Sequence, residues 1–221
     1  MAETYLDHSL AKLEQFEGSI PWMYRDTAGH VTVGVGLMLP DAAAAARLTF
    51  VVDGRAATAD EIAAEFARVD ALPMGRPALF YRAPENGEGK PELPQSEIDS
   101  LLRNVLTGFE GELRAGLSDY DGFPDSVKLA LLDMAYNLGP AGLLHGYPRM
   151  IKAVEAGNWA QAAANCERVG PGAARNNWTR EMFLQNVVGG IKAEAESAVK
   201  QVGYGLVGIA ASLWTRARKK P

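Results

Sequence analysis

The first segment of the chain has the hydrophobic spacing of an amphipathic helix. Its apolar residues recur at intervals of four, three and three positions: Leu6, Leu10, Leu13 and Phe16. This repeat places them on one helical face, which is expected to be buried. Gly18 is suited to end the helix, because glycine readily adopts the left-handed backbone of a helix terminus. Glu17 is therefore predicted at the C-terminal edge of this helix, where the chain turns.

The next segment changes to the alternation of a strand. Between residues 31 and 36, valines alternate with threonine and glycine, which is typical of a strand with one buried face. Residues 26–29, Asp-Thr-Ala-Gly, have the composition of a turn. Residues 24–36 are thus predicted to form a small β-hairpin, with Asp26 near its bend and Thr32 on the returning strand.

The remaining pattern is mainly helical. Helices are expected over residues 42–47, 58–69, 96–117, 126–138, 148–156, 159–168 and 175–201, and a strand over residues 48–52. Residues 58–61, Thr-Ala-Asp-Glu, form a capping box. The helix over 126–138 is apolar almost all round, which predicts burial at the centre of its lobe. Residues 72–94 hold five of the 12 prolines and are expected to form a long ordered loop or flap.

These elements predict an α+β fold that is mainly helical. We expect a single domain made of two lobes joined by the long helix 96–117. The expected parts are a β-containing lobe over 17–95, a helical lobe over 96–201 that includes helix 5–17, and a C-terminal tail over 202–221. The 221 residues are 48% hydrophobic, which is enough for a core without disulfides.

Composition and charge narrow the function classes. The net charge of −5 argues against a nucleic-acid binder, because no broad basic face is available to neutralise phosphates. Cys166 is the single cysteine, and we interpret it as a buried inert thiol rather than a nucleophile. The histidines at 8, 30 and 145 lack metal-ligand spacing, so neither a metal nor another cofactor is expected. His30 is interpreted as a surface residue.

Targeting and membrane signals are weak. Residues 1–16 mix charged and apolar positions without the hydrophobic run of a secretory signal. The apolar stretch 202–214 is short for a membrane span. We expect a protein made in the cytoplasm without a signal peptide.

Two carboxylates near the N-terminus suggest acid–base chemistry. Hydrolysis of a glycosidic bond requires an acid that protonates the leaving oxygen and a second group that supplies or activates a nucleophile. Glu17 on a helix end and Asp26 on a hairpin can face one cleft, and the Thr32 hydroxyl can hold a water. Each residue alone is most simply a solvated surface group, so the prediction depends on the three together.

The segment from Glu17 to Gly36 resembles the catalytic signature of the phage T4-type lysozymes, glycoside hydrolase family 24. That signature is Glu, eight residues, Asp or Cys, five residues, Thr. Here eight residues separate Glu17 from Asp26, and five separate Asp26 from Thr32. The surrounding frame matches as well, at Gly18, Tyr24, Gly29, Gly34 and Gly36.

This resemblance implies a lysozyme-like fold and an inverting muramidase. The expected reaction cleaves the β-1,4 bond between N-acetylmuramic acid and N-acetylglucosamine in peptidoglycan. Glu17 would be the general acid, kept protonated by partial burial. Asp26 would be ionised and would polarise the attacking water, which Thr32 helps to orient. An inverting pair has its carboxyl groups about 6.5–9.5 Å apart, against about 5 Å in a retaining pair.

Weaker resemblance extends over residues 6–186, with gaps. Residues 131–139 resemble the family's central buried helix, and residues 157–163 resemble the helix that follows. Residues 175–183 resemble a late helix whose arginine approaches the catalytic glutamate. Arg175 or Arg180 would take that place, with Arg175 preferred because it is nearer the helix start. The expected substrate-binding residues are Tyr24, Gly36, Tyr136 and Asn137.

The chain also departs from the family pattern. Leu37 stands where many relatives carry histidine, residues 40–95 are longer than in compact phage enzymes, and the charge is acidic. One alternative is a catalytically inactive glycan-binding or adaptor module. Another is an enzyme that acts on chitin or chitosan, or that cleaves the bond without water. A phosphate-binding role for Gly34-Val-Gly36 is rejected in favour of a tight hairpin, since the full motif is absent.

The biological setting is open between two routes to the periplasmic cell wall. A phage endolysin would reach it on lysis or export. An antibacterial effector toxin would be delivered there, and an immunity protein should then exist to plug its cleft. In either case we expect a monomer whose partner is a peptidoglycan glycan strand.

Overall fold

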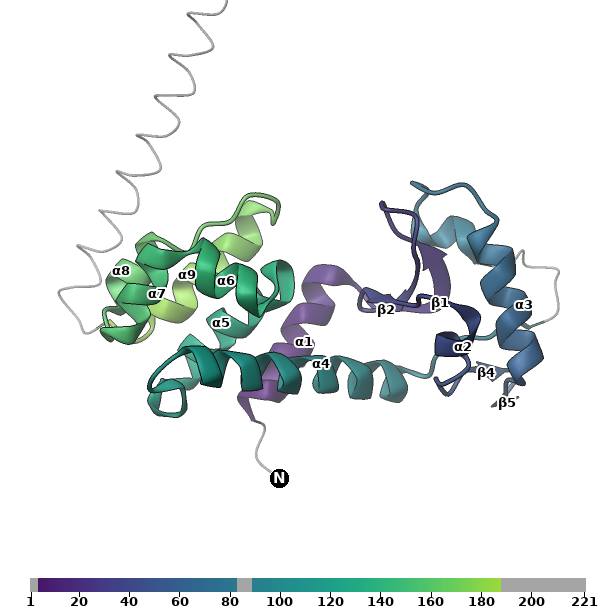
Figure 1. Ribbon diagram of the computed structural model, residues 1–221, viewed down its shortest axis with the longest axis horizontal. Coiled ribbons are helices and arrows are strands. Elements are labelled where there is room, and N and C mark those ends of the chain that lie inside the picture. Colours follow the sequence, from purple (N-terminus) through teal and green to yellow (C-terminus); the bar gives the residue numbers. More distant parts are fainter. Residues whose placement is uncertain (1–3, 83–88, 188–221) are drawn as a thin grey trace, which may run out of the picture. The chain divides into compact units, whose positions relative to one another are not determined.

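The computed structural model describes residues 4–82 and 89–187 (Figure 1). Within them the fold is α+β and mainly helical, as predicted. The chain divides into two compact units, which we call the N-terminal unit (Leu6–Thr107) and the C-terminal unit (Gly108 onward, with Tyr5). The predicted lobe boundaries and the joining of both into one domain stay predictions. The predicted tail 202–221 lies outside the described residues.

Helix α1 (Tyr5–Glu17) forms as the hydrophobic spacing indicates. Leu10 and Leu13 are buried on its inner face. The helix ends at Gly18, which has φ +79° and whose amide donates to the Glu14 carbonyl at 2.9 Å. An L-residue with a side chain would be strained in this backbone conformation, so the glycine fixes where the helix stops.

A three-stranded antiparallel sheet follows, in the order β1 (Ile20–Arg25), β2 (Val31–Gly34) and β3 (Leu37–Met38). The predicted hairpin is present, although β1 begins earlier than residue 24. The third strand was not predicted, because two residues are too few to show a period. Val35 and Gly36 form the turn into β3, and φ values of +66° at Gly34 and +79° at Gly36 confirm that these glycines serve a tight hairpin.

The rest of the N-terminal unit surrounds this sheet. It comprises α2 (Ala42–Ala45), β4 (Val51–Val52), β5 (Arg55–Ala56), α3 (Ala59–Asp70) and η1 (Ala78–Tyr81). The capping box at Thr58 and Glu61 is confirmed. The predicted loop 72–94 contains the short helix η1 and is anchored by Tyr81, which is fully buried and donates to the Pro73 carbonyl at 2.8 Å.

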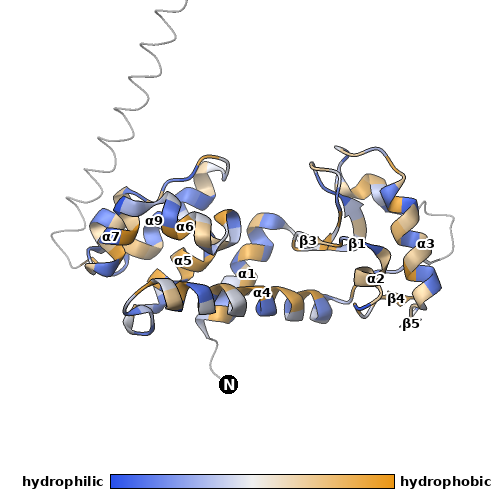
Figure 2. Cartoon of the chain, in the orientation of Figure 1, coloured by the Kyte–Doolittle hydropathy of each residue, from blue (hydrophilic) through white to orange (hydrophobic). Residues whose placement is uncertain are grey.

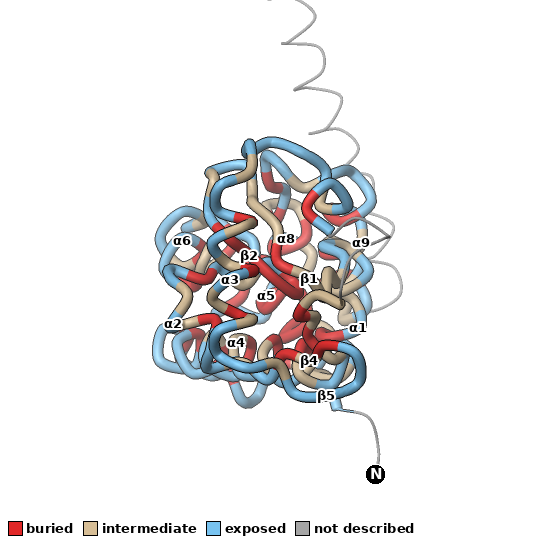
Figure 3. Tube along the Cα trace, turned by 90° about the vertical axis from the view of Figure 1, so that its right-hand side faces the viewer, coloured by how far each residue is buried: buried red, intermediate tan, exposed pale blue. Residues whose placement is uncertain are grey.

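The C-terminal unit is helical. The chain enters it along α4 (Gln95–Gly116) and continues through η2 (Tyr120–Gly122), α5 (Asp125–Leu138), α6 (Pro140–Gly146), α7 (Pro148–Glu155), α8 (Trp159–Ala164) and α9 (Ala173–Leu184). Helix α5 is buried from Val127 to Ala135, which confirms its predicted central place. Figure 2 shows hydrophobic positions on α5, and Figure 3 colours the described residues by how far each is buried.

Three helix predictions and one strand prediction need correction. Helix α8 ends at Ala164 rather than at residue 168, and the strand expected over 48–52 is formed only by Val51 and Val52. Helix α6 was not predicted, because Gly139-Pro140 suggests a stop; the proline instead occupies the first turn of a new helix, where its missing amide proton costs nothing. Helix α9 ends at Leu184 rather than continuing to residue 201, and residues 185–187 form a turn and bend. The expected continuation after residue 187 lies outside the described residues. Every helix over 4–82 and 89–187 is too short or too polar to cross a membrane.

A buried carboxylate, Asp133 on α5, holds the helices of the C-terminal unit together. Its Oδ2 accepts from Arg168 Nη2 at 2.6 Å and from the Thr179 hydroxyl at 2.8 Å. Its Oδ1 accepts from Arg175 Nε at 2.7 Å. Both guanidinium groups are at least nine-tenths buried, so their charges depend on this carboxylate for compensation.

We expect Asp133→Asn to destabilise the protein by about 3–5 kcal/mol, because it leaves two buried arginines without their counter-charge. Urea unfolding followed by circular dichroism measures the change. The matched control is Glu167→Gln, since Glu167 is 65% exposed in its pair with Arg180 and an exposed pair contributes about 1 kcal/mol or less. Equal stability of the two variants would contradict this assignment.

Candidate active site

The three signature residues all belong to the N-terminal unit. Glu17 is the last residue of α1, Asp26 directly follows β1, and Thr32 lies in β2, as the sequence predicts. Their environments differ, since Glu17 is exposed, Asp26 is half-buried and Thr32 is buried with 3% of its surface exposed. The partial burial expected for Glu17 is therefore not found. Its position at the end of α1 places it beyond the apolar face formed by Leu10 and Leu13.

Asp26 organises the turn between β1 and β2. Its Oδ1 accepts from the amide of Ala28 at 2.9 Å and from the amide of His30 at 2.8 Å. The backbone closes the same turn, because the Asp26 amide donates to the His30 carbonyl at 3.0 Å and the Gly29 amide donates to the Asp26 carbonyl at 3.1 Å. An aspartate side chain that bonds amides two and four residues ahead stabilises a turn that the backbone alone would hold weakly.

These hydrogen bonds also control the charge of Asp26. Burial acts to raise the pKa of its carboxyl group, but hydrogen bonds from the His30 amide, the His30 ring and the Ala28 amide together bring the pKa below its ordinary value. Donors directed at a carboxylate favour its ionised form. The geometry thus supports an ionised Asp26 at neutral pH.

Tyr24 is influenced by the charges of both carboxylates. It lies on β1 opposite Thr32 in the hairpin register. Burial raises the pKa of its phenol, and the negative charges of Asp26 and Glu17 raise it further. The charges of both carboxylates therefore act on this phenol.

Thr32 is more constrained than the sequence indicates. Its hydroxyl donates to the His30 carbonyl at 3.1 Å. The hydroxyl proton is therefore used in the hydrogen bond within the turn. The lone pairs of the hydroxyl oxygen can still accept a hydrogen bond from a water. Thr32 can orient a water only by accepting a hydrogen bond from it.

Arg25 attaches the turn to the rest of the N-terminal unit, and the sequence analysis missed it. Its Nε donates to the Gly29 carbonyl at 2.9 Å, while its Nη1 donates to the carbonyls of Asp70 at 2.9 Å and Leu72 at 2.7 Å. Figure 1 shows the β1–β2 turn and the loop after α3 at the same end of this unit. In the sequence, Arg25 directly precedes Asp26, which places it near the predicted turn. Its carbonyl partners lie 45 and 47 positions away, and no local pattern in the sequence predicts them.

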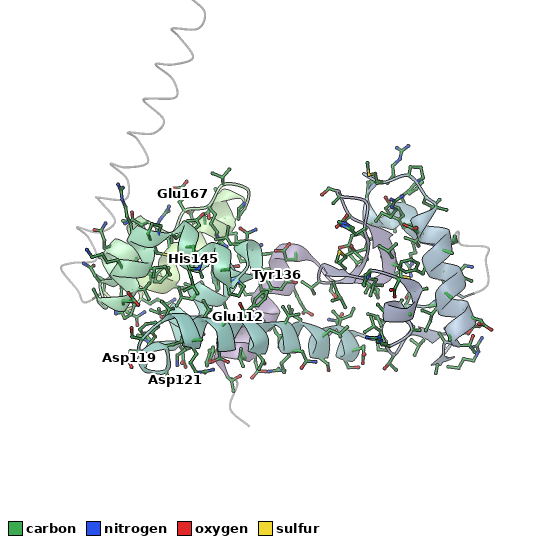
Figure 4. The ribbon with its side chains drawn as sticks, viewed as in Figure 1. Glu112, Asp119, Asp121, Tyr136, His145 and Glu167 are labelled. Carbon is green, nitrogen blue, oxygen red and sulfur yellow. The ribbon has the colours of Figure 1, made fainter. Side chains whose placement is uncertain are left out.

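The structure gives less information about the predicted substrate-binding residues Gly36, Tyr136 and Asn137. Gly36 is exposed in the turn into β3. Tyr136, labelled on α5 in Figure 4, is half-buried with its ring centroid 6.4 Å from that of Phe109, and Asn137 is exposed. Contacts of these residues with a sugar stay predictions.

The two predicted arginines lie in different surroundings within the C-terminal unit. Arg175 is buried against Asp133, whereas Arg180 Nη1 donates to the Asn177 side chain at 2.8 Å. The predicted approach of either arginine to Glu17 stays a prediction.

A surface pocket of about 370 Å³ lies elsewhere in the N-terminal unit. Its lining includes Arg55 and Glu61, which form an ion pair at 2.5 Å, and the neighbouring Glu65 and Lys90. The predicted site residues are absent from this lining. We therefore assign this pocket no part in the chemistry.

Metal and thiol chemistry find no support in the described residues. Within 4–82 and 89–187, histidine, cysteine and acidic side chains do not gather in a group of three that could hold a metal ion. Cys166 is buried, as predicted, and burial raises the pKa of its thiol to about 11, which favours the protonated form.

No protein-family model matches the chain, and no curated protein matches it.

We expect Asp26→Asn to make stability less dependent on acid pH. The asparagine keeps a turn acceptor but does not titrate, whereas the aspartate has a folded-state pKa below its unfolded value of about 3.9. Its ionised form therefore stabilises the fold above about pH 4, and this contribution is lost as the pH falls through the lowered folded-state pKa. Urea unfolding between about pH 6 and pH 2 measures the difference between the two proteins. A difference that does not change with pH would contradict this.

Proposed function

We propose that the protein is a peptidoglycan hydrolase, a muramidase that cleaves the β-1,4 bond between N-acetylmuramic acid and N-acetylglucosamine. The observation that carries the proposal is the placement of the signature residues in one unit, with Glu17 at the end of α1, Asp26 directly after β1 and Thr32 on β2. The negative charges of Glu17 and Asp26 both raise the pKa of the Tyr24 phenol. These are the two carboxylates of the lysozyme-like signature. Glycosidases use such pairs, one carboxyl group as acid and the other opposite the leaving group.

The two carboxylates suit different roles because their surroundings differ. Asp26 is held ionised by hydrogen bonds, which suits a group that offsets positive charge on the sugar in the transition state. Glu17 is exposed at the end of a helix. A glycan strand lying on it would exclude water and favour the neutral carboxylic acid, which is the form that can protonate the leaving oxygen.

The competing function is a glycan-binding or adaptor module with the same fold and no activity. The presence of Glu17, Asp26 and Thr32 together, with Asp26 held ionised, favours the enzyme. A muramidase of this kind would serve as a phage endolysin or as an antibacterial effector delivered to the periplasmic wall. In the effector case an immunity protein is its second partner, after the glycan strand.

We expect Glu17→Gln to reduce cleavage of purified peptidoglycan by about 10²–10⁴-fold, the usual contribution of a general acid. Mass analysis of soluble fragments measures the reducing muramic ends that hydrolysis produces. Glu14→Gln is the matched control, because Glu14 lies one turn earlier on α1 and outside the signature. Anhydro ends would indicate a transglycosylase instead, and intact protein that cleaves no wall preparation would leave the binding module as the better proposal.

We further expect the first product to have the α configuration at the new reducing end. Inversion of a β-linked sugar by direct attack of water has this outcome, whereas a retaining pair would release the β anomer. Proton NMR during the first minutes of digestion, before the anomers equilibrate, distinguishes the two. Initial release of the β anomer would contradict the inverting mechanism and would imply carboxyl groups about 5 Å apart.

A further inference from the structure

His30 contacts the candidate site through its ring as well as its backbone. Its Nδ1 lies 3.3 Å from Asp26 Oδ2. An ionised carboxylate can only accept, so this contact requires the proton of a neutral imidazole to be on Nδ1. The other nitrogen, Nε2, is then an unprotonated acceptor. The His30 side chain is 55% exposed, and its Nε2 makes no hydrogen bond to any residue that the structure describes.

Asp26 is poorly suited to take a proton from water. Its Oδ1 already accepts two amide hydrogen bonds, and its Oδ2 faces the His30 ring. Bonds that stabilise a carboxylate weaken it as a base. An imidazole is in general a stronger base than a carboxylate by roughly two to three pKa units. The proposed reaction needs a proton acceptor opposite Glu17, and the better acceptor beside Asp26 is His30.

We propose that His30 Nε2 accepts the proton of the attacking water, while Asp26 stays ionised and orients the ring. This inference rests on the proposed hydrolase function. It goes beyond that function by assigning the base to a residue outside the lysozyme-like signature. The arrangement follows the general logic of a histidine base held in one tautomer by a carboxylate.

The proton and bond changes balance in this scheme. The water oxygen bonds to the anomeric carbon as the glycosidic C–O bond breaks. Glu17 gives its proton to the leaving oxygen, and His30 Nε2 takes a proton from the water. Glu17 ends as a carboxylate and His30 as an imidazolium beside the negative Asp26. Proton transfer from His30 to Glu17 through solvent restores both groups for the next turnover.

The charges around the turn favour this exchange. On the hairpin itself, the carboxylate of Asp26 lies beside the ring, with Oδ2 3.3 Å from Nδ1. Arg25 is the opposing cation, but its guanidinium is engaged by the carbonyls of Gly29, Asp70 and Leu72.

The loop that follows α3 packs on the β1–β2 turn and brings little charge close to His30. It places the apolar Met74 against Gly29. The neighbouring Arg76 stacks on the Phe80 ring with its guanidinium 5.5 Å from the centroid, and the Asp70 side chain is exposed.

The test is the variant His30→Asn, which keeps a donor near Asp26 but cannot accept a proton at neutral pH. We expect kcat on peptidoglycan to fall by about 10²–10⁴-fold, and the shape of the pH profile to differ from that of the intact enzyme. We also expect added imidazole to restore part of the activity of His30→Ala. His8→Asn, an exposed histidine of α1, is the matched control. Unchanged kcat and pH profile in His30→Asn would overturn the proposal.

A second measurement does not depend on activity. Nitrogen-15 NMR of the histidine rings is expected to show His30 with its proton on Nδ1 in the intact protein, and to show loss of that preference in Asp26→Asn. A proton on Nε2 in the intact protein would refute the pairing even if the enzyme cleaves its substrate. Conversely, an Nδ1 proton in a protein that cleaves no peptidoglycan would mean that the pair exists but that the proposed function, and the base role with it, is wrong.

Discussion

The hydrogen bonds from the amides of Ala28 and His30 to Asp26 Oδ1 are the constraint on which the candidate site depends. They close the turn between β1 and β2 and thereby set the register in which Tyr24 lies opposite Thr32. A shift of one residue would turn these side chains to the other face of the sheet. Arg25 then attaches the turn to α3 and the following loop, so the geometry at Asp26 is supported from outside the hairpin.

The same hydrogen bonds limit what Asp26 can do. Donors that stabilise the turn also stabilise the negative charge, and a stabilised carboxylate holds its charge well but accepts protons poorly. Fold stability and basicity therefore compete at this residue. A neighbouring imidazole resolves the competition, because His30 can exchange a proton while Asp26 keeps its charge.

Local patterns in the sequence account for much of the fold. The stop at Gly18, the capping box at Thr58 and the buried helix α5 each depend on residues within a few positions of one another, and each is confirmed. The hairpin that carries Asp26 and Thr32 is predictable for the same reason. Strand β3 escapes prediction because its two residues show no period, and α6 because a proline that stops one helix can equally begin another.

Long-range contacts explain what the sequence could not predict at the site. The exposure of Glu17 depends on which residues pack against the end of α1. The carbonyl partners of Arg25 are 45 and 47 positions away in the sequence, a separation that no hydrophobic period predicts. The resemblance to a catalytic signature identifies residue types and spacing. It does not say which oxygen of Asp26 is already occupied, and this decides whether that residue can act as the base.

Asp26 and Asp133 show that the groups hydrogen-bonded to an aspartate determine its role. Asp133 is 3% exposed and its two oxygens accept from Arg168, Arg175 and Thr179. Its charge compensates two buried guanidinium groups, so we assign it a role in stability. Asp26 bonds neutral amides and a titratable ring at the surface, where a change of charge on its partner is tolerated. The turn therefore suits the proposed proton transfer, whereas the buried cluster of the C-terminal unit depends on the fixed charge of Asp133.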